Sequence, residues 1–405
     1  MQCPTRLRAV VSAALAALLV SCAAPKPEPA KPAPAKRPAP DFSAVESALN
    51  AAIGNQAFPG CSVAVGTSED ILWQTGLGHF TYSKRNPVTV NTIYDLASLT
   101  KVTGTTALLM KLSGDGKLHA SDLLSKHIPE FLTKAKDAQD RARRAQVTLE
   151  HVMTHSAGLV SWKPFYKTCD SYDKLLQAVL AAPLETDPGK RYKYSDLGFI
   201  LLGEVASRAG GAPAPQLERQ LLVHQLGMSD TLRNPQSALR MRIPPTERKP
   251  DATGFIHGEV HDENARFGGG GTGHAGLFST VGDLSKYAIE LLRARAGQSR
   301  VFKQDVVREF TRRQGVEGSN RGQGWQKPSG SNSAGAILSR TSFGHTGFTG
   351  TSIWIDPERD FFVILLTNRV HPTREDSKIS AVRRAVTDEA AKAFDAWQMK
   401  GIKSS

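Results

Sequence analysis

The sequence predicts an α/β fold in which a central antiparallel sheet is flanked by a helix from each end of the chain and interrupted by a mainly helical insertion. Three observations predict it. Short runs rich in β-branched and aromatic residues occur near both ends of the 405-residue chain. The stretch between them shows apolar residues at helical spacing, and a helical pattern also precedes the first of these runs and follows the last. Sheet elements at both ends therefore belong to one interrupted sheet.

The N-terminal sheet elements follow a helical stretch. From residue 41 to 57 apolar residues recur at helical spacing, and Gly54 is the expected stop. The runs 61–65 and 71–74 are rich in β-forming residues and are separated by a polar turn. This arrangement predicts a β-hairpin that follows directly on a helix.

The C-terminal part supplies matching strands at 351–355 and 361–366, followed by a helical pattern at 376–397. We assign residues 41–400 to one folded domain, with its sheet part at about 41–97 and 340–400 and its helical part at about 98–339. Three helical segments are predicted inside that part: one from Thr148 that ends before Gly158, one at 195–209 before Gly210, and one at 284–295 opened by a Thr280-x-x-Asp283 cap.

The first 21 residues have the pattern of a secretory signal. Arg6 and Arg8 precede an apolar run at 9–20 that is too short to span a bilayer as a helix. The run ends in Leu-Val-Ser-Cys at residues 19–22, which resembles the lipobox of bacterial lipoproteins, in which the signal is cut before the cysteine and Cys22 is lipidated. An ordinary signal peptide with an incidental cysteine is the alternative.

Residues 22–40 are dominated by Pro, Ala and Lys, a composition that stays extended and acts as a tether. A lipid on Cys22 followed by this tether predicts attachment to a membrane surface without a transmembrane helix. Ala23 is not the Asp that would indicate retention in the inner membrane. We therefore expect a lipid-anchored protein of the bacterial cell envelope, at the periplasmic face of the outer membrane.

The formal net charge of +13 favours anionic partners. No run of Lys and Arg is interleaved with aromatic residues, so we expect no nucleic-acid partner. Of the four cysteines, only Cys61 and Cys169 remain in the predicted folded part. A disulfide between them and two buried thiols are both compatible with an oxidising compartment.

Ser98 and Lys101 carry the main chemical hypothesis. They are three residues apart at the start of an apolar, Thr-rich helical stretch, so their side chains would share one face. A serine hydroxyl becomes nucleophilic when a nearby group takes its proton, and a desolvated lysine can do so. Free backbone N–H groups at a helix start would also face a developing oxyanion. Alone, Ser-x-x-Lys is a common chance pattern and is equally compatible with a solvated helix start.

Two later motifs accompany that pair. Tyr194-Ser195-Asp196 follows a Pro-Gly turn, and His345-Thr346-Gly347 precedes an alternating apolar run. The ordered set Ser-x-x-Lys, Tyr-Ser-x, x-Thr-Gly resembles the serine β-lactamase and penicillin-binding-protein superfamily, closest to its class C-like branch of D-alanyl-D-alanine peptidases and esterases. Further segments resemble the family from about residue 41 to 397, including 148–159 and 273–280.

The resemblance implies a β-lactamase/transpeptidase-like fold and a set of roles. Ser98 is the nucleophile, Lys101 the general base and Tyr194 a proton relay. Thr346 and Gly347 lie on an edge strand where a substrate amide pairs, and backbone N–H groups form the oxyanion hole, namely those of Ser98 and Phe348. Considered without the family, Tyr194 is more typical of a buried tyrosine with a bonded hydroxyl.

Two positions depart from the common pattern of the family. Asp196 stands where many relatives carry Asn, and its charge would help to keep Lys101 protonated, which leaves the identity of the general base open. Asp196 at a helix start is equally typical of a helix cap. His345 stands where many β-lactamases carry Lys, and we expect it to donate to a substrate carboxylate or to the proton relay, with a charge that changes near neutral pH. An exposed strand histidine is the alternative.

The glycine-rich stretch 268–273 is a weak phosphate-site candidate, because no Gly-Lys-Ser/Thr follows it, and we expect a mobile loop near the site. Nearby acidic and histidine residues are conceivable metal ligands, but Gly258 breaks the helix that a His-x-x-x-His site requires. We expect no metal and no cofactor. The conceivable ligands are His257, His261, Asp262, Glu263 and His274.

These observations predict a serine hydrolase that forms an acyl-enzyme on amide or ester substrates. A D-alanyl-D-alanine carboxypeptidase or endopeptidase acting on peptidoglycan peptides is favoured by the expected envelope anchor and by His345. A short-chain carboxylesterase, a class C-like β-lactamase and a non-catalytic penicillin-binding lipoprotein remain alternatives. A cationic group placed for a terminal carboxylate would favour the peptidase, and an apolar slot the esterase.

Overall fold

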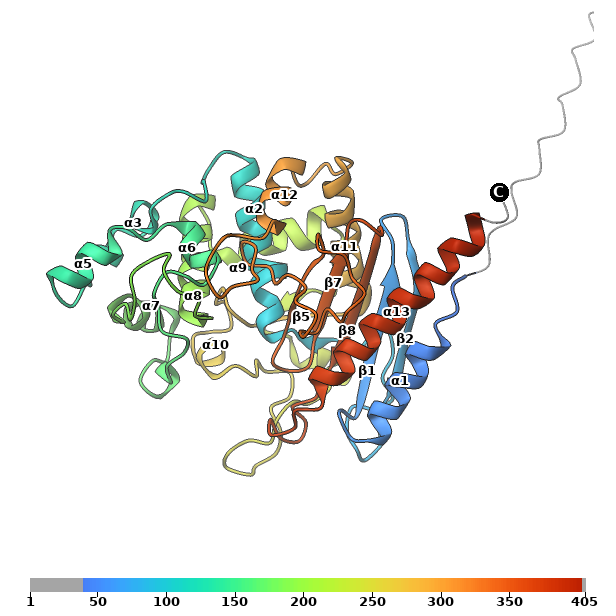
Figure 1. Ribbon diagram of the computed structural model, residues 1–405. Coiled ribbons are helices and arrows are strands. Elements are labelled where there is room, and N and C mark those ends of the chain that lie inside the picture. The colour runs from blue at the N-terminus through green and yellow to red at the C-terminus, as the bar shows by residue number, and fades with distance from the viewer. Residues whose placement is uncertain (1–38, 403–405) are drawn as a thin grey trace, which may run out of the picture. The chain divides into compact units, whose positions relative to one another are not determined.

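The computed structural model describes residues 39–402, and a five-stranded antiparallel sheet lies between helices (Figure 1). The strand order β2-β1-β8-β7-β6 places strands from both ends of the chain side by side. The predicted fold class is confirmed, as are the N-terminal hairpin and the C-terminal strand pair. The bounds are β1 Gly60–Gly66, β2 Ile71–Gly78, β6 Phe343–Thr346, β7 Ser352–Asp356 and β8 Phe361–Thr367.

The predicted signal peptide, Cys22 and nearly all of the tether lie outside the described residues. Within residues 39–402, no helix combines the length and the apolar character needed to cross a bilayer. Cys61 and Cys169 are both buried and carry free thiols, so the question of a disulfide between them is answered in favour of two thiols.

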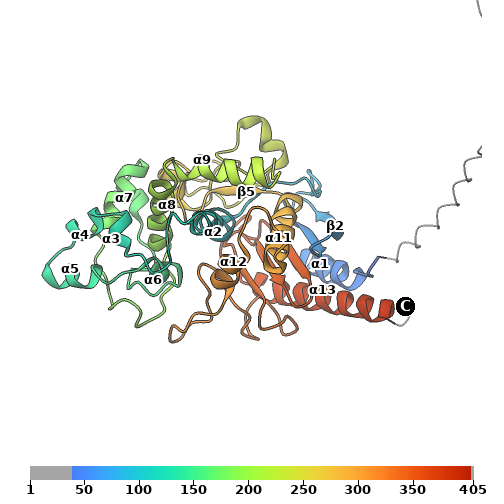
Figure 2. The ribbon, with the colours of Figure 1, turned by 90° about the horizontal axis from the view of Figure 1, so that it is seen from above.

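The two faces of the sheet are covered by different parts of the chain. Alternate residues of β8 point to opposite faces, as the strand period requires. Phe361, Val363 and Leu365 pack with α1 (Ser43–Gly54) and α13 (Ile379–Ile402). Phe362, Ile364 and Leu366 join the core of the helical part. Figures 1 and 2 show the resulting layers, with α1 and α13 together on one face and α11 (Val281–Ala296) against the other.

The inserted part between β2 and β6 is mainly helical, as predicted, and it also contains a small three-stranded sheet. Its strand order is β3-β5-β4, with β3 Tyr94–Asp95, β4 Leu232–Arg233 and β5 Leu277–Ser279. The other helices are α2 Thr106–Gly114, α3 Leu124–His127, α4 Glu130–Thr133, α5 Ala138–Arg144, α6 Leu149–Met153, α7 Tyr172–Ala181, α8 Asp196–Gly210, α9 Ala214–Glu218, α10 Glu263–Phe267 and α12 Gln304–Thr311.

Helix boundaries follow local capping chemistry. The predicted cap at Thr280 is present, since its side chain accepts a bond from the Asp283 N–H. At Ser195, the side chain accepts from the Gly198 N–H and caps α8. Asp196 is therefore the first helical residue, and the cap that the sequence allowed for it belongs to its neighbour.

Candidate active site

Ser98 lies on an irregular turn between β3 and α2. The sequence predicted a regular helix start, but the structure has a 3₁₀ turn at Ala97–Leu99 and a π turn at Lys101–Thr105 before α2 begins. Ala97 adopts a positive φ of 46°, and its N–H donates to Asp95 Oδ1 over 2.8 Å. A non-glycine residue in this region carries about 1–3 kcal/mol of strain, which surrounding contacts must offset. This turn holds Ser98 at the edge of an open hollow of about 440 Å³.

Lys101 meets Ser98 as the three-residue spacing predicted. Its Nζ lies 2.9 Å from Ser98 Oγ, 3.0 Å from the His274 carbonyl oxygen and 2.7 Å from Asp196 Oδ1, and its side chain is 0% exposed. Burial alone lowers the pKa of a lysine, but the Asp196 carboxylate and the Tyr194 oxygen outweigh it and hold the pKa of Lys101 above its ordinary value. Lys101 is thus a paired cation in the free enzyme.

Tyr194 lies immediately before α8, with its ring facing Lys101. The Lys101 Nζ is 5.1 Å from the Tyr194 ring centroid. The centroid of the Tyr194 ring also lies 4.4 Å from that of the His155 ring. His155 Nδ1 accepts from the Ser195 N–H over 3.1 Å, so this buried histidine fixes the backbone that carries Tyr194.

His345 is buried rather than exposed, and its charge does not respond near neutral pH. Its side chain is 2% exposed, and Nδ1 bonds to the carbonyl oxygen of Thr346 over 2.8 Å. Burial, together with the Arg321 and Lys101 charges, holds the pKa of His345 well below its ordinary range. The expected change of charge near pH 7 is therefore wrong, because a buried imidazole beside two cations stays neutral.

The predicted Thr-Gly motif lies at the end of β6, the outer strand of the main sheet, next to the Ser98 turn. A Cβ at Gly347 would lie 2.3 Å from the Leu96 carbonyl oxygen, so only glycine fits here. The Thr351 hydroxyl donates to the same carbonyl over 3.0 Å. Buried Arg383 donates to the carbonyl oxygens of Gly347 and Thr351 over 2.7 and 2.8 Å. These contacts fix the backbone of Gly347, which precedes Phe348, against that of Leu96.

Arg321 is the residue of this site that the sequence did not indicate. A backbone ladder brings it there, since residues 321 and 326 are bridged and the Gln326 N–H donates to the Gly344 carbonyl over 2.8 Å. The guanidinium carbon lies 5.2 Å from the Tyr194 ring centroid. Arg321 is 6% exposed, and its buried Nε and Nη1 have no hydrogen-bond partner among the described residues.

Two further unpaired polar atoms belong to histidines whose rings lie near that of Tyr194. His155 Nε2 and His345 Nε2 are buried and have no partner among residues 39–402. Burial, and next the Arg321 charge, hold the pKa values of both histidines well below their ordinary range. Ser98, Tyr194, Arg321 and His345 line one hollow. Buried polar groups are normally hydrogen-bonded, so this cluster is built to receive polar atoms from a ligand.

The glycine-rich loop lies beside the site, as expected, but it is tied down. Its Gly273 carbonyl accepts from Thr105 Oγ1 over 2.7 Å, and its Gly270 and Ala275 carbonyls accept from Arg233 Nη1 over 2.7 and 3.0 Å. These bonds fix the His274 carbonyl that holds Lys101. The predicted mobility of the loop stays a prediction.

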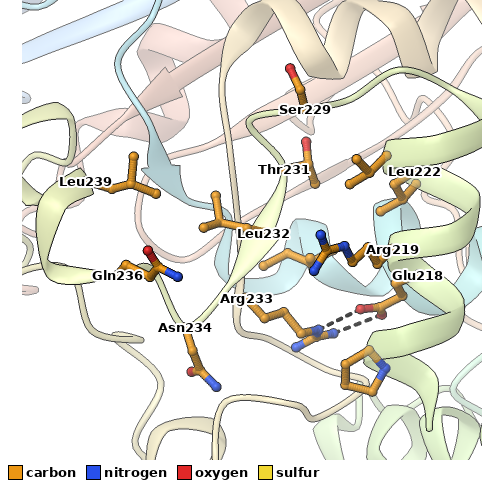
Figure 3. A pocket seen from close by; sticks show the side chains of 13 residues that line it. Glu218, Arg219, Leu222, Ser229, Thr231, Leu232, Arg233, Asn234, Gln236 and Leu239 are labelled. Carbon is orange, nitrogen blue, oxygen red and sulfur yellow. Dashed lines mark hydrogen bonds and ion pairs between the residues drawn. The ribbon is translucent and has the colours of Figure 1, made fainter.

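A second hollow, of about 470 Å³, lies behind this loop and does not include Ser98 among its lining residues. Figure 3 shows the ion pair of Glu218 and Arg233 in its wall, with N–O distances of 2.6 and 2.9 Å. A Cβ at Gly104 would lie 2.5 Å from Glu218 Oε1, so this pair packs directly on the turn that follows Lys101. The wall of this second hollow therefore contacts the turn Lys101–Thr105.

The conceivable metal ligands named from the sequence form separate histidine–carboxylate pairs. His274 Nε2 lies 2.9 Å from Asp262 Oδ1, and His261 Nε2 lies 3.1 Å from Glu247 Oε2. In the part of the chain that the structure describes, no three or more such side chains come together as a metal site would need.

The comparisons with known proteins agree with this geometry. The "Beta-lactamase" family model matches residues 42–387. The chain belongs to the β-lactamase family. Within it, the chain is 32% identical over 309 residues to an Escherichia coli K12 protein named "Putative D-alanyl-D-alanine carboxypeptidase", covering 70% of each chain. A Salmonella agona protein of the same name is 32% identical over 321 residues, covering 72% of this chain and 73% of its own.

Solved structures of this family share the fold. A penicillin-binding protein homologue from Caulobacter crescentus superposes with a TM-score of 0.71 at 18% identity, covering 88% of this chain and 98% of its own. EstCE1, a hydrolase with promiscuous acyltransferase activity, gives 0.67 at 18% identity, covering 86% and 98%. The chain is thus a hydrolase of the β-lactamase family, and its neighbours in fold include a penicillin-binding protein homologue and a hydrolase with acyltransferase activity.

Proposed function

We propose that this β-lactamase-family hydrolase is a serine carboxypeptidase that removes the last residue of peptides ending in D-alanyl-D-alanine. Ser98 Oγ attacks the carbonyl of the last peptide bond and forms an ester, the C–N bond breaks, and free D-alanine leaves as its amine takes a proton. Water then hydrolyses the ester and restores Ser98. The curated relatives that carry a carboxypeptidase name support the substrate class.

The proton of Ser98 needs an acceptor, and the paired state of Lys101 favours Tyr194 in this role. Lys101 already holds its proton, because Asp196 raises its pKa against the effect of burial. Tyr194 faces that cation, so its oxygen would take up the Ser98 proton next to a positive charge. In this scheme Tyr194 receives the proton from Ser98 and delivers it to the leaving amine. The N–H groups of Ser98 and Phe348 stabilise the oxyanion.

The observation that carries the peptidase assignment is Arg321. A substrate that ends in D-alanine brings a free carboxylate within a few bonds of the reacting carbonyl. Arg321 shares the hollow with Ser98 and presents buried N–H groups that nothing in the described protein accepts. A carboxylate is the planar, doubly accepting anion that a guanidinium binds best. An ester substrate with an alkyl leaving group has no such anion to offer.

The test is intact-mass spectrometry together with turnover, with the wild type beside Ser98→Ala. A D-alanyl-D-alanine peptide, a penicillin and a p-nitrophenyl ester are compared. We expect a covalent adduct with the penicillin on the wild type alone and release of D-alanine from the peptide. Turnover of the ester with none of the peptide would replace this proposal with the esterase, and rapid hydrolysis of the penicillin would replace it with a β-lactamase. Turnover in Ser98→Ala would exclude the acyl-serine.

We further propose that the enzyme acts from a lipid anchor on Cys22 at the bacterial envelope, where peptidoglycan peptides are present. The lipobox-like sequence at residues 19–22 and the tether that follows support this. Cys22→Ser should release active enzyme from the membrane fraction of expressing cells. Unchanged sedimentation of the variant with membranes would contradict the anchor.

A further inference from the structure

Three aromatic side chains form a row that the proposed reaction does not use. Trp162 and Tyr166 have ring centroids 6.4 Å apart, and Tyr166 and Phe267 are stacked at 6.0 Å with an angle of 26° between the planes. Trp162 is 42% exposed and Phe267 is 46% exposed. Large aromatic faces left open to water on a folded protein mark a binding surface more often than chance.

The row is built on the two segments that hold Lys101. The Ser161 carbonyl, one residue before Trp162, accepts from the N–H of Asp196 over 2.9 Å. At the other end, Phe267 closes α10, whose N-cap Asp262 pairs with His274. Asp196 and the His274 carbonyl both contact Lys101 Nζ. The row is therefore carried by two segments that are bonded to the residues holding Lys101.

The row is also rigidly supported. Asn264 is 1% exposed and clamps the loop, since its Nδ2 donates to the Lys163 carbonyl over 2.8 Å and its Oδ1 accepts from the Tyr166 N–H over 2.9 Å. Ser195 Oγ donates to the Val160 carbonyl over 2.6 Å. A surface held by buried bonds at both ends is organised before any ligand arrives, which lowers the entropic cost of binding.

The chemistry of the row distinguishes among occupants. A fatty acyl chain is matched by aliphatic side chains, whereas the row is made of three flat rings, two of which carry a donor at the edge. No residue among 39–402 is bonded to the Trp162 indole N–H or to the Tyr166 hydroxyl, so both remain available to a ligand. The Arg266 guanidinium lies 5.5 Å from the Phe267 ring centroid and adds a further polar edge. Rings with an apolar face and many hydroxyls match this pattern, as in the pyranose rings of a glycan.

The direction in which the substrate peptide would leave Ser98 agrees with a glycan at the row. With the terminal carboxylate at Arg321, the amino-terminal part of the peptide must leave Ser98 on another side. The row lies outside the hollow that contains Arg321 and begins next to Asp196. In peptidoglycan the amino-terminal end of the peptide is joined to a sugar.

We propose that Trp162, Tyr166 and Phe267 form a carbohydrate subsite that stacks the amino-sugar rings to which the substrate peptide is attached. This inference rests on the proposed peptidase function and names the larger substrate of the same site. The enzyme then prefers peptides still attached to glycan over free peptides. No covalent step occurs at the subsite.

The test compares a sugar-free pentapeptide with the same pentapeptide on its disaccharide, using the full chain. We expect the disaccharide to raise kcat/KM roughly tenfold, mainly through a lower KM. Trp162→Ala and Phe267→Ala should remove this gain and leave turnover of the free peptide unchanged. Trp162→Phe keeps a stacking face and should retain most of the gain. Met241→Ala, an exposed apolar side chain elsewhere, is the matched control.

Calorimetric titration with an N-acetylglucosamine tetramer separates this inference from the proposed function. Binding that is lost in Trp162→Ala and kept in Met241→Ala supports the subsite, even if no peptide is turned over. An equal gain from the disaccharide in wild type and Trp162→Ala would overturn it. Loss of activity on long-chain p-nitrophenyl esters in Trp162→Ala, without loss of glycan binding, would overturn it in favour of an acyl-chain subsite.

Discussion

Two buried cations lie close to the Tyr194 ring, at 5.1 and 5.2 Å from its centroid, and the protein treats them differently. Lys101 is 0% exposed and has Ser98, Asp196 and the His274 carbonyl within 3.0 Å of its Nζ. Arg321 is 6% exposed, and its Nε and Nη1 have no partner among the described residues. A buried charge without a partner costs several kcal/mol.

The difference lies in the source of the counterion, which the protein supplies for Lys101 and a ligand would supply for Arg321. The counterion of Lys101 is built in, so the state of the catalytic centre is set before substrate binds. No residue among 39–402 supplies a counterion for Arg321, so the free energy of pairing becomes available only when an anion arrives. A substrate with a carboxylate pairs the buried Arg321 charge and a substrate without one does not, so the site selects for the carboxylate. The two sites are thus distinguishable by mutation.

Removing the paired cation should have the largest effect. Lys101→Ala leaves the Asp196 carboxylate without its counterion and removes the cation that faces Tyr194. We expect the acylation rate to fall by about a thousandfold or more, measured as the rate of adduct formation with a fluorescent penicillin. Lys101→Ala with Asp196→Asn is the control, because it removes both charges. If the single variant acylates at the wild-type rate, the catalytic role of Lys101 is excluded.

Removing the unpaired cation should affect one substrate class only. Arg321→Gln keeps a polar side chain but loses the charge, so we expect KM for a D-alanyl-D-alanine peptide to rise by roughly ten- to a hundredfold. Turnover of an uncharged p-nitrophenyl ester should change little, since it has no carboxylate to bind. Arg312→Gln, an exposed arginine away from the hollow, is the control. Equal losses on both substrates would show that Arg321 supports the site rather than the substrate.

Removing the carboxylate of the Lys101–Asp196 pair should shift the pH profile of kcat/KM rather than abolish activity. Asp196→Asn removes the carboxylate that raises the pKa of Lys101, while the burial that lowers it remains. Lys101 then loses its proton at lower pH. If the cation is the active form, the alkaline limb of kcat/KM shifts to lower pH. If neutral Lys101 is instead the base, activity near pH 8 rises in the variant, so the sign of the change decides between the two schemes.

Much of the fold and of the Lys101 side could be predicted from the sequence, because the information is local. Period-two runs define the strands, and a spacing of three residues brings Ser98 to Lys101. Ser195 next to Asp196 is a harder case, because both residue types cap helices and only the backbone geometry assigns the cap to Ser195. The π turn after Ser98 was not foreseeable, since it depends on contacts such as that of Gly104 with Glu218.

The Arg321 side could not be predicted, because it depends on contacts between distant segments. Nothing near residue 321 marks it among the many arginines of the chain, and its place follows from the bridges to Gln326 and onward to Gly344. The burial of His345 has the same origin. Its position in an alternating strand is compatible with either face of the sheet, and the neighbouring charge that keeps it neutral comes from Arg321.

The smallest expected effect concerns stability. Burial, and next the Arg321 charge, keep His155 and His345 neutral when folded, whereas they gain protons near pH 6.5 when unfolded. The free energy of unfolding should therefore decrease as pH falls below about 6.5, by up to about 1.4 kcal/mol per pH unit for each histidine. In Arg321→Gln the folded pKa values rise, so the decrease starts at the same pH but ends sooner. Urea unfolding between pH 7.5 and 5 measures this, and superposable profiles would show that the Arg321 charge does not reach the two imidazoles.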